Sequence, residues 1–312
     1  MITDLKLVDS LFSQLSSPIS IPGGDMPGDS LKIENDRLQK AKIILPHLLE
    51  RITDKIVTSP TGKVVVSVCG GSGIGKSGIA ALLAYALNRM DIKTYVLSGD
   101  NYPHRVPPVN DAERVRRYRE YGYKALVSLD NYGQELDSAV KALWDRDTDA
   151  DSTLRNIYPW LATYQDAGAE ALRRYLGTPE EIDFFELNNL IAAFRAGTQV
   201  LRLKRMGRDE MNLWYDPVDF SKTRILLLEW THGNSRYLNG VDIPVYLHSS
   251  PQETLAGRLA RNRDCALDSP FVTLVLNIEQ EKLFAQAQYS AILVLMNGEV
   301  VSYATLLKHL DD

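Results

Sequence analysis

The chain has 312 residues, enough for one large α/β domain or for a core domain with a sizeable insertion. Its composition, 45% hydrophobic and 24% charged, is ordinary for a globular protein, and its net charge of −5 provides no basic field for nucleic acid or anionic membranes. No apolar run approaches the roughly 20 residues that span a bilayer. The cysteines, Cys69 and Cys265, are too few for a disulfide framework or a cysteine metal cluster. The first residues, MITDLKLVDSLFSQ, lack the basic start and apolar core of a signal peptide, so we expect a cytoplasmic protein that binds neither nucleic acid nor membranes.

Residues 1–62 are predicted to form an N-terminal extension that is partly helical. The stretch PGGDMPGD is rich in turn formers, whereas residues 35–57 have a helical pattern in which Pro46 marks a kink or a break. We interpret the extension as a packing or dimerisation element, and the second reading would make the protein a homodimer.

A glycine-rich loop follows an apolar strand at 63–69 and precedes a predicted helix at 76–90. The loop reads GGSGIGKS and fits the GxxxxGK[ST] pattern of a P-loop. Gly73 and Gly75 allow backbone conformations in which successive N–H groups face phosphate oxygens. Lys76 supplies an ammonium group for the β- and γ-phosphates, and the Ser77 hydroxyl is a ligand for Mg²⁺. We therefore predict that ATP, with Mg²⁺, is bound by Gly70, Gly71, Ser72, Gly73, Ile74, Gly75, Lys76, Ser77 and Gly78.

The remaining pattern predicts a doubly wound α/β fold with a mainly parallel sheet. A strand at 93–98 follows the first helix, and this unit predicts that the strands at 63–69 and 93–98 form a parallel pair. Residues 111–178 read as almost continuous helix, which we interpret as a helical insertion into a core domain that spans 63–312. Apolar strands suit a sheet that is covered on both faces. The other predicted elements are helices at 184–196, 251–263 and 278–288 and strands at 198–205, 224–229, 241–248, 291–296 and 300–301.

Two carboxylates end predicted strands of this sheet. Asp100 follows the strand in LSGDNYPH, and Glu229 closes the strand in RILLLE. Ligands of open α/β sheets collect at the carboxyl ends of the strands, and a carboxylate beside a buried strand needs a metal, a proton or a cap. A turn or cap role explains Asp100 equally well, whereas ILLLE offers no turn chemistry for Glu229.

Four segments in this order resemble the uridine kinase and phosphoribulokinase family of P-loop kinases: GGSGIGKS, SGDNYPH, TPEEIDF and ILLLEW. The resemblance implies an ATP-dependent kinase that phosphorylates a hydroxyl of a small metabolite. It implies that Asp100 accepts the proton of that hydroxyl, that Glu229 holds Mg²⁺ together with Ser77, and that Asp183 lies near the acceptor. The segment ETLAGRLARNRD resembles the family's lid helix. This assigns Arg258 to the nucleotide, and Arg261 and Arg263, together with Lys76, to catalysis.

The chain departs from that family in three places. Trp230 stands where the family carries a glycine after the glutamate, and we expect it to shape the acceptor pocket. Arg263 is the last arginine of the chain, so the later Arg-Gly of the lid is missing. The insertion has no counterpart in the small nucleoside kinases. The acceptor therefore stays open among a sugar, a sugar phosphate, a nucleoside and a hydroxy acid.

Residues next to the two carboxylates are further candidates for acceptor binding. They are Tyr102, His104 and Arg105 after Asp100, and Thr231, His232 and Asn234 after Glu229. The competing interpretation is a proline-rich surface loop for the first group and a turn role for Asn234.

The sequence contains two clusters of arginine and lysine. We read Arg114, Arg116, Arg117 and Arg119 as a solvated helix face paired with neighbouring acids. Only an acceptor that carries phosphate or carboxylate would make them, or Arg202, Lys204, Arg205 and Arg208, binding residues. The aromatic residues at 158–164 and 214–215 are expected to serve packing.

Two other functions stay open. LSGDNYPHR also resembles the GDN-x-x-Arg stretch of adenylylsulfate kinases, which ranks second because the insertion, TPEEIDF and the Glu-ended strand fit the first family better. The other is a nucleotide-gated regulator or ATPase that acts on a partner. A requirement for a small hydroxylated acceptor would separate a kinase from such an ATPase.

Overall fold

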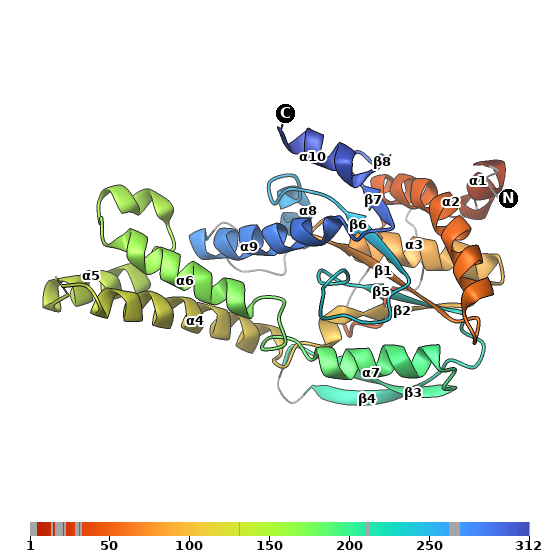
Figure 1. The fold of residues 1–312 in the computed structure, drawn as a ribbon, viewed down its shortest axis with the longest axis horizontal. Coiled ribbons are helices and arrows are strands. Elements are labelled where there is room, and N and C mark those ends of the chain that lie inside the picture. Colours follow the sequence, from red (N-terminus) through yellow and green to blue (C-terminus); the bar gives the residue numbers. More distant parts are fainter. Residues whose placement is uncertain are drawn as a thin grey trace.

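A six-stranded, mainly parallel sheet forms the centre of the computed structural model (Figure 1). The structure describes residues 5–13, 15, 21, 23–28, 31, 33–130, 132–209, 212–261 and 269–311. The strand order is β2-β5-β1-β6-β7-β8, and only the last strand runs antiparallel to its neighbour. The strands are β1 (Val64–Gly70), β2 (Thr94–Ser98), β5 (Ile225–Glu229), β6 (Ile243–Leu247), β7 (Ile292–Val294) and β8 (Val300–Val301). The predicted doubly wound α/β fold is confirmed.

β5 lies between β1 and β2, so the prediction that the first two strands pair directly is wrong. β5 is parallel to both, and Glu229 is in register with Val68 on one side and Ser98 on the other. Apolar strands cannot reveal their neighbours through composition, because every central position of a covered sheet favours the same residues. The order places the strand that ends in Glu229 directly between the strand that leads to the P-loop and the strand that leads to Asp100.

Helices cover both faces of the sheet, as the side chains of β1 illustrate. Val64, Val66 and Val68 face the helices α2 and α3, whereas Val65 faces α7 and the small ribbon beyond it. The N-terminal helix α2 is therefore part of the core, and it continues through Pro46 as a single helix. These covering helices are α1 (Leu5–Phe12), α2 (Asn35–Thr58), α3 (Lys76–Arg89), α7 (Phe184–Arg195), α9 (Pro270–Ala287) and α10 (Tyr303–Asp311).

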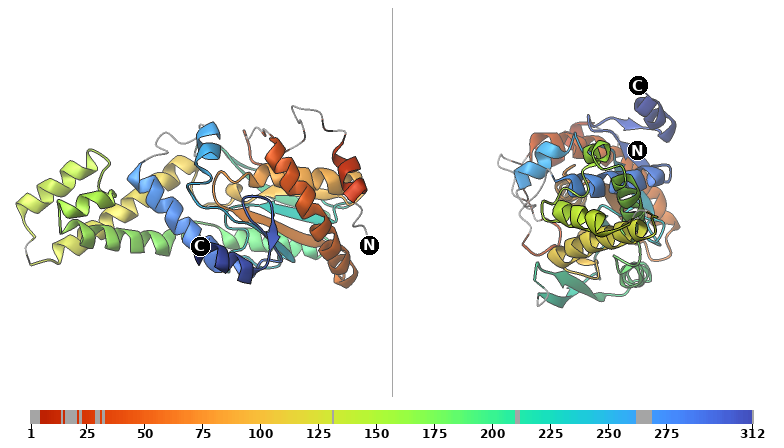
Figure 2. Two further views of the ribbon diagram at one scale, coloured as in Figure 1. Left: turned by 90° about the horizontal axis from the view of Figure 1, so that it is seen from above. Right: turned by 90° about the vertical axis from the view of Figure 1, so that its left-hand side faces the viewer.

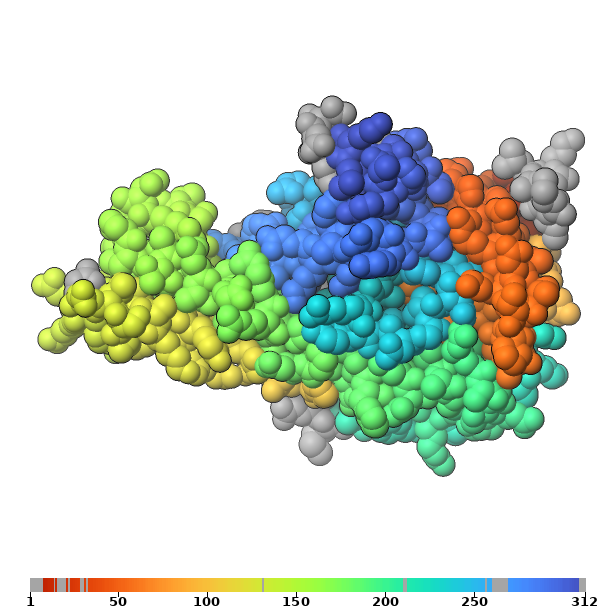
Figure 3. All heavy atoms as spheres, viewed as in Figure 1, coloured from red at the N-terminus to blue at the C-terminus, as the bar shows by residue number. Residues whose placement is uncertain are grey.

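The helical insertion projects from one end of the core (Figures 1 and 2), and its surface forms a separate lobe (Figure 3). It consists of α4 (Pro107–Val127), α5 (Gln134–Trp144), the 3₁₀ helix η2 (Ser152–Asn156) and α6 (Leu161–Tyr175). Two glycines let α4 and α6 approach closely. A Cβ on Gly122 would lie 2.7 Å from the Tyr164 ring, and a Cβ on Gly168 would lie 2.5 Å from the Tyr118 ring. α9 packs against this lobe through Val275 and thereby ties it to the core.

A two-stranded antiparallel ribbon lies outside α7 (Figure 1). Its strands are β3 (Val200–Met206) and β4 (Leu213–Asp219). β3 was predicted as a short strand and β4 was not. The packing role expected for the aromatic residues at 214–215 is wrong, because Trp214 and Tyr215 are 41% and 45% exposed. Within the described residues, no helix combines the length and apolar character needed to cross a membrane.

Candidate active site

The P-loop occupies the turn between β1 and α3. Gly73 and Gly75 have φ angles of +88° and +94°, in the left-handed region that disfavours other residues. A Cβ on Gly73 would also lie 2.8 Å from the carbonyl oxygen of Thr254. The Lys76 side chain is buried, and its Nζ donates to the carbonyl of Gly71 at 3.0 Å, across the loop. The backbone that the motif predicted is therefore present.

Glu229 lies beside this loop at the end of β5. Its Oε2 accepts a hydrogen bond from the Ser77 hydroxyl at 3.0 Å, and its Oε1 accepts one from the Ser98 hydroxyl at 2.9 Å. Burial and the nearby Asp100 carboxylate raise the pKa of Glu229 to about 7, while Lys76 opposes this shift. Asp100 follows β2 in the short 3₁₀ helix η1 (Gly99–Asn101) and is exposed. Both predicted carboxylates thus share one edge of the sheet with the P-loop.

The donor atoms at this edge fit a magnesium ion. Mg²⁺ takes oxygen ligands, keeps several waters and is held through one or two carboxylates together with substrate phosphates. The Ser77 hydroxyl and the Glu229 carboxylate supply such oxygens. The repulsion between the Glu229 and Asp100 carboxylates is the kind of electrostatic cost that a bound cation relieves.

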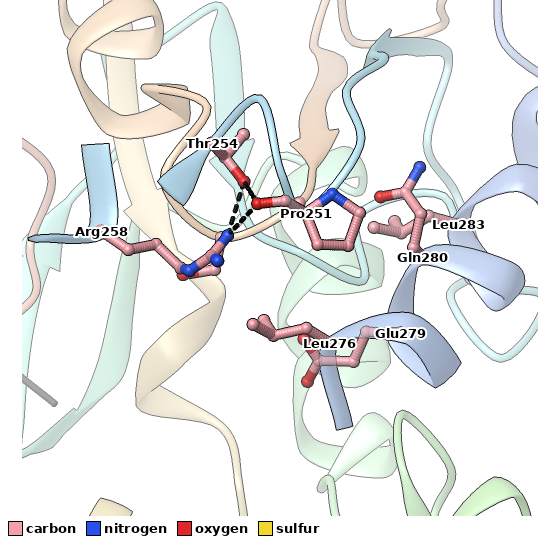
Figure 4. A pocket seen from close by; sticks show the side chains of 9 residues that line it. Pro251, Thr254, Arg258, Leu276, Glu279, Gln280 and Leu283 are labelled. Carbon is pink, nitrogen blue, oxygen red and sulfur yellow. Dashed lines mark hydrogen bonds between the residues drawn. The ribbon is translucent and has the colours of Figure 1, made fainter. Parts of the chain in front are cut away.

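Arg258 of α8 (Leu255–Arg261) and side chains of α9 line one cavity together with Gly71 and Ser72 of the P-loop (Figure 4). Arg258 donates from Nη1 to the Pro251 carbonyl at 2.8 Å and to the Thr254 hydroxyl at 2.7 Å. A small cavity above Gly71 and Ser72 is lined by Pro251, Thr254, Arg258, Leu276, Glu279, Gln280 and Leu283. Arg258, which the resemblance assigns to the lid, thus lies beside the P-loop. Of the other two lid arginines, only the backbone of Arg261 is described, and Arg263 lies outside the described residues.

Arg37 is a residue at this site that sequence reasoning missed. It lies in the N-terminal helix α2, and its side chain is 14% exposed. A Cβ on Gly75 would lie 2.9 Å from Arg37 Nε, and a Cβ on Gly78 would lie 2.9 Å from Arg37 Cδ. A glycine inside a helix costs roughly 0.5–1 kcal/mol relative to alanine. Arg37 lies so close to the first turn of α3 that a larger residue at position 78 would collide with it. This explains why a glycine stands there despite its cost to the helix.

A buried polar cluster lies where the insertion joins the core, and it centres on Glu181. Glu181 Oε1 accepts from Asn110 Nδ2 at 2.8 Å and from Arg114 Nε at 2.8 Å, and Oε2 accepts from the Gly177 N–H at 2.6 Å. Glu279 of α9 lies 3.7 Å from Arg114 Nη2. Burial opposes ionisation, but Arg114 above all, with the N–H donors, holds the pKa of Glu181 below its usual value.

The interpretation of the basic run on α4 is therefore only partly right. Arg116, Arg117 and Arg119 pair with acids, as predicted, although their partners include the largely buried Glu113 and Asp149. Arg114 instead faces Glu181, whose side chain is 1% exposed. Glu180 and Glu181 are adjacent and identical in the sequence, so no local signal distinguished the surface glutamate from the buried one.

His232 lies next to this cluster, and its role in acceptor binding stays a prediction. Its ring packs against Gly177, where a Cβ would lie 2.7 Å from His232 Cε1, and its centroid is 5.2 Å from that of Trp230. Burial lowers the pKa of His232 to about 4, with Glu181 opposing and Arg114 reinforcing the shift. The imidazole is therefore neutral at pH 7, when it offers one donor and one acceptor.

Four other predicted acceptor residues pack or form hydrogen bonds within the fold. Trp230 and Tyr102 are buried in the apolar cluster between the sheet, α7 and the ribbon. Asp183 caps α7 by accepting from the Glu186 N–H at 2.8 Å. Asn234 accepts from the Ser67 hydroxyl at 3.1 Å and donates to that of Ser290 at 2.7 Å, which fits the structural reading of this residue. Thr231 is half-buried.

His104 and Arg105 line a separate cavity of about 240 Å³ next to the ribbon, together with Val106, Lys204, Met206 and Leu213. Arg105 also donates to the Tyr175 hydroxyl at 3.1 Å, which in turn donates to Asn110 at 2.7 Å. Arg105 is thereby linked to the cluster around Glu181, whereas His104 contacts the carbonyl of Pro179 at 3.0 Å.

The fold and this site define a P-loop nucleotide-binding protein with two carboxylates at the strand ends beside the loop. The profile of the Adenylylsulphate kinase family matches residues 62–123. Over 255 residues the chain is 38% identical to the bifunctional alpha-galactosidase/sucrose kinase AgaSK of Mediterraneibacter gnavus, a match that covers 81% of this chain. It spans 22% of the length of that curated relative. In the P-loop region and over most of its length, the chain is similar to P-loop kinases.

Two solved structures were also aligned with the chain. One is a candidate fructose transport system kinase from Silicibacter sp. TM1040, at 16% identity and a TM-score of 0.46 over 79% of this chain and 94% of that one. The other is a candidate uridine kinase from Bacillus stearothermophilus, at 16% identity and a TM-score of 0.36 over 72% of this chain and 93% of that one.

Proposed function

We propose that the chain transfers the γ-phosphoryl group of ATP to a hydroxyl of a neutral sugar, with a disaccharide of the sucrose type as the acceptor. The observation that carries this proposal is the meeting of Ser77, Glu229 and the Asp100 turn at one sheet edge. The hydroxyl oxygen forms a bond to the γ-phosphorus, the bond from this phosphorus to the β–γ bridging oxygen breaks, and the proton passes to Asp100. The products are a sugar phosphate and ADP.

The residues around the P-loop divide the work of phosphoryl transfer, which depends mostly on positioning and charge neutralisation. The loop N–H groups and Lys76 hold the β- and γ-phosphates. Arg37, which also pairs with Glu34 at 3.3 Å, and Arg258 add positive charge next to the loop. We assign Arg261 and Arg263 to the closing lid. Ser77 and Glu229 would hold Mg²⁺, which supplies charge neutralisation on the phosphate oxygens when it is bound.

The cluster around Glu181 suits an uncharged acceptor with several hydroxyls. The charge of Arg114 is balanced by Glu181 and accompanied by Glu279, so the cluster offers hydrogen-bonding groups without excess positive charge. Neutral His232 adds a group that can donate to or accept from a hydroxyl. The similarity to AgaSK supports a sugar, because of that protein's two named activities only the kinase requires a triphosphate-binding loop.

An adenylylsulfate kinase-like activity is the second candidate, favoured by the family match over residues 62–123. Adenylylsulfate is an anion and would need unbalanced positive charge at the acceptor site. The glutamates beside Arg114 disfavour such a ligand. Either reaction consumes ATP, and we place it in the cytoplasm, where ATP is available.

An ADP-release screen tests this proposal. Sucrose, monosaccharides, sugar phosphates, nucleosides and adenylylsulfate are offered with MgATP, and the Lys76→Ala variant serves as the blank. We expect ADP release that depends on sucrose or a related neutral sugar, with a product that mass spectrometry shows to have gained one phosphoryl group. ATP hydrolysis stimulated only by a protein or a nucleic acid would contradict the kinase assignment, and turnover with adenylylsulfate alone would favour the second candidate.

A further inference from the structure

A short piece of the N-terminal segment, residues 23–28, crosses the ends of β2 and β5 next to the candidate metal site. A Cβ on Gly24 would lie 3.4 Å from Val96 Cγ1 and 3.8 Å from Glu229 Oε1. β2 is the edge strand of the sheet, so its outward N–H groups have no strand to pair with. Asp25 of this segment accepts a hydrogen bond from one of them, the Ser98 N–H.

Asp25 anchors this piece of chain. Its Oδ1 accepts from the Ser98 N–H at 2.7 Å and from Asn101 Nδ2 at 3.3 Å. Its Oδ2 accepts from the Tyr95 hydroxyl at 3.0 Å and from Arg205 Nη1 at 2.8 Å. The side chains of Asp25 and Arg205 are only 8% and 7% exposed, so this is a buried ion pair that joins the N-terminal segment to β3.

The groups that Asp25 holds on its Oδ1 side flank the predicted catalytic base. Ser98 and Asn101 lie on either side of the Gly99–Asp100 pair. The Ser98 hydroxyl donates to Glu229, so one residue connects Asp25 to the candidate metal carboxylate. The Asn101 side chain also accepts from the Met206 N–H at 3.0 Å, which ties the turn to β3. The turn that carries Asp100 is therefore held from outside the sheet by Asp25 and by the ribbon.

We propose that Asp25 is a positioning residue for phosphoryl transfer: its carboxylate docks the N-terminal segment on Arg205 and fixes the Ser98–Asn101 turn so that Asp100 faces the acceptor hydroxyl. This inference rests on the proposed function, because it concerns the base of that reaction. Asp25 touches neither phosphate nor acceptor in this scheme. Its loss should therefore act on turnover and leave nucleotide binding in place.

The experiment compares Asp25→Ala with a matched variant at the far end of the sheet. Asp242 has the same chemistry as Asp25, because it accepts from a strand N–H, that of Val65, at 2.9 Å and pairs with Arg195. For Asp25→Ala we expect kcat to fall by up to about 100-fold, the cost that a displacement of about 1 Å at a reacting group can have. We expect an unchanged dissociation constant for MgATP, and for Asp242→Ala a kcat close to that of the wild type. Thermal unfolding of both variants reports any general loss of stability.

Amide hydrogen exchange gives a readout that needs no turnover. The Ser98 amide should exchange faster in Asp25→Ala than in the wild type and should be unchanged in Asp242→Ala. If the wild type turns over no acceptor, the proposed function has failed. The exchange measurement still reports whether Asp25 holds the Ser98–Asn101 turn.

Three results for Asp25→Ala would overturn the positioning role. They are an unchanged rate of amide exchange at Ser98, a kcat no lower than that of Asp242→Ala, and a weakened MgATP affinity that accounts for the whole loss of activity. If Asp25→Ala does not fold, Arg205→Met replaces it. That variant removes the ion pair but leaves the bonds to Ser98 and Asn101, and we expect it to lower kcat by less, again at unchanged MgATP affinity. An unchanged kcat for a folded Arg205→Met would then count against the positioning role of Asp25.

Discussion

Replacing Glu181 by glutamine tests the polar cluster at the junction between the insertion and the core. The carboxylate receives donors on both oxygens: Asn110 and Arg114 on Oε1 and the Gly177 N–H on Oε2. Glutamine keeps one acceptor oxygen and places an NH₂ group against a donor on the other side. The change therefore removes a charge and leaves at least one buried donor without an acceptor.

The size of the effect follows from these contacts. A hydrogen bond to a charged group contributes about 1.5–3 kcal/mol, and breaking one side of a buried ion pair costs about 3–5 kcal/mol. Arg114 retains Glu279 at 3.7 Å and Asp111 at 3.3 Å, which offsets part of the loss. We therefore expect Glu181→Gln to lower the free energy of unfolding by about 3 kcal/mol, at the lower end of that range. If the cluster binds the acceptor, the KM for the sugar should rise while the KM for ATP stays the same.

The neighbouring glutamate supplies the control for this experiment. Glu180 pairs with Arg117 at the surface and its side chain is 57% exposed, so Glu180→Gln should change stability by about 0–1 kcal/mol. Urea denaturation measures the free energy of unfolding, and the ADP-release assay measures the KM values for the sugar and for ATP. Equal stabilities for the two variants would refute the buried-pair reasoning. An unchanged sugar KM in a folded Glu181→Gln would remove the cluster from the acceptor site.

Three further predictions concern the base, the phosphates and the pH response. Asp100→Asn should lower kcat and leave the MgATP affinity unchanged. If the variant keeps the kcat of the wild type, Asp100 is not the base. Arg37→Met should weaken MgATP binding about 10-fold, as expected for the loss of one charge-assisted contact, and calorimetry measures this affinity. Arg89→Met, at the far end of α3, is the control. If both variants bind MgATP equally well, Arg37 is not part of the phosphate site. His232 has a pKa of about 4 when folded against 6.5 as its ordinary value. Between these values the unfolded chain binds more protons, so the free energy of unfolding should fall by up to about 3 kcal/mol as the pH drops from 6.5 to 4. His232→Gln should flatten that slope in urea denaturation at several pH values, and an unchanged slope would show that another group causes it.

The sequence predicted the parts of this protein whose physics is local. The P-loop is set within eight residues, because Gly73 and Gly75 permit the left-handed backbone that the phosphate cradle needs. Apolar runs such as ILLLE predicted buried strands. β4 escaped prediction because most of its side chains are exposed, so it shows no apolar periodicity.

The active-site arrangement, in contrast, depends on contacts between distant segments. Local pattern allowed β1 and β2 to be neighbours, and only the assembled sheet inserts β5 between them and brings Glu229 to Ser77 and Ser98. In the same way, packing decides that Glu181 is buried and Glu180 is not.

The N-terminal extension shows the same division most clearly. Its sequence indicated a loop and a helix, but the tertiary structure alone places Asp25 against the Asp100 turn and Arg37 against the P-loop. Residue type and periodicity report whether a segment is helical, extended, buried or exposed. They do not report which distant segment covers it, because many partners satisfy the same burial and hydrogen-bonding requirements, and the choice among them is made by the packing of the whole chain.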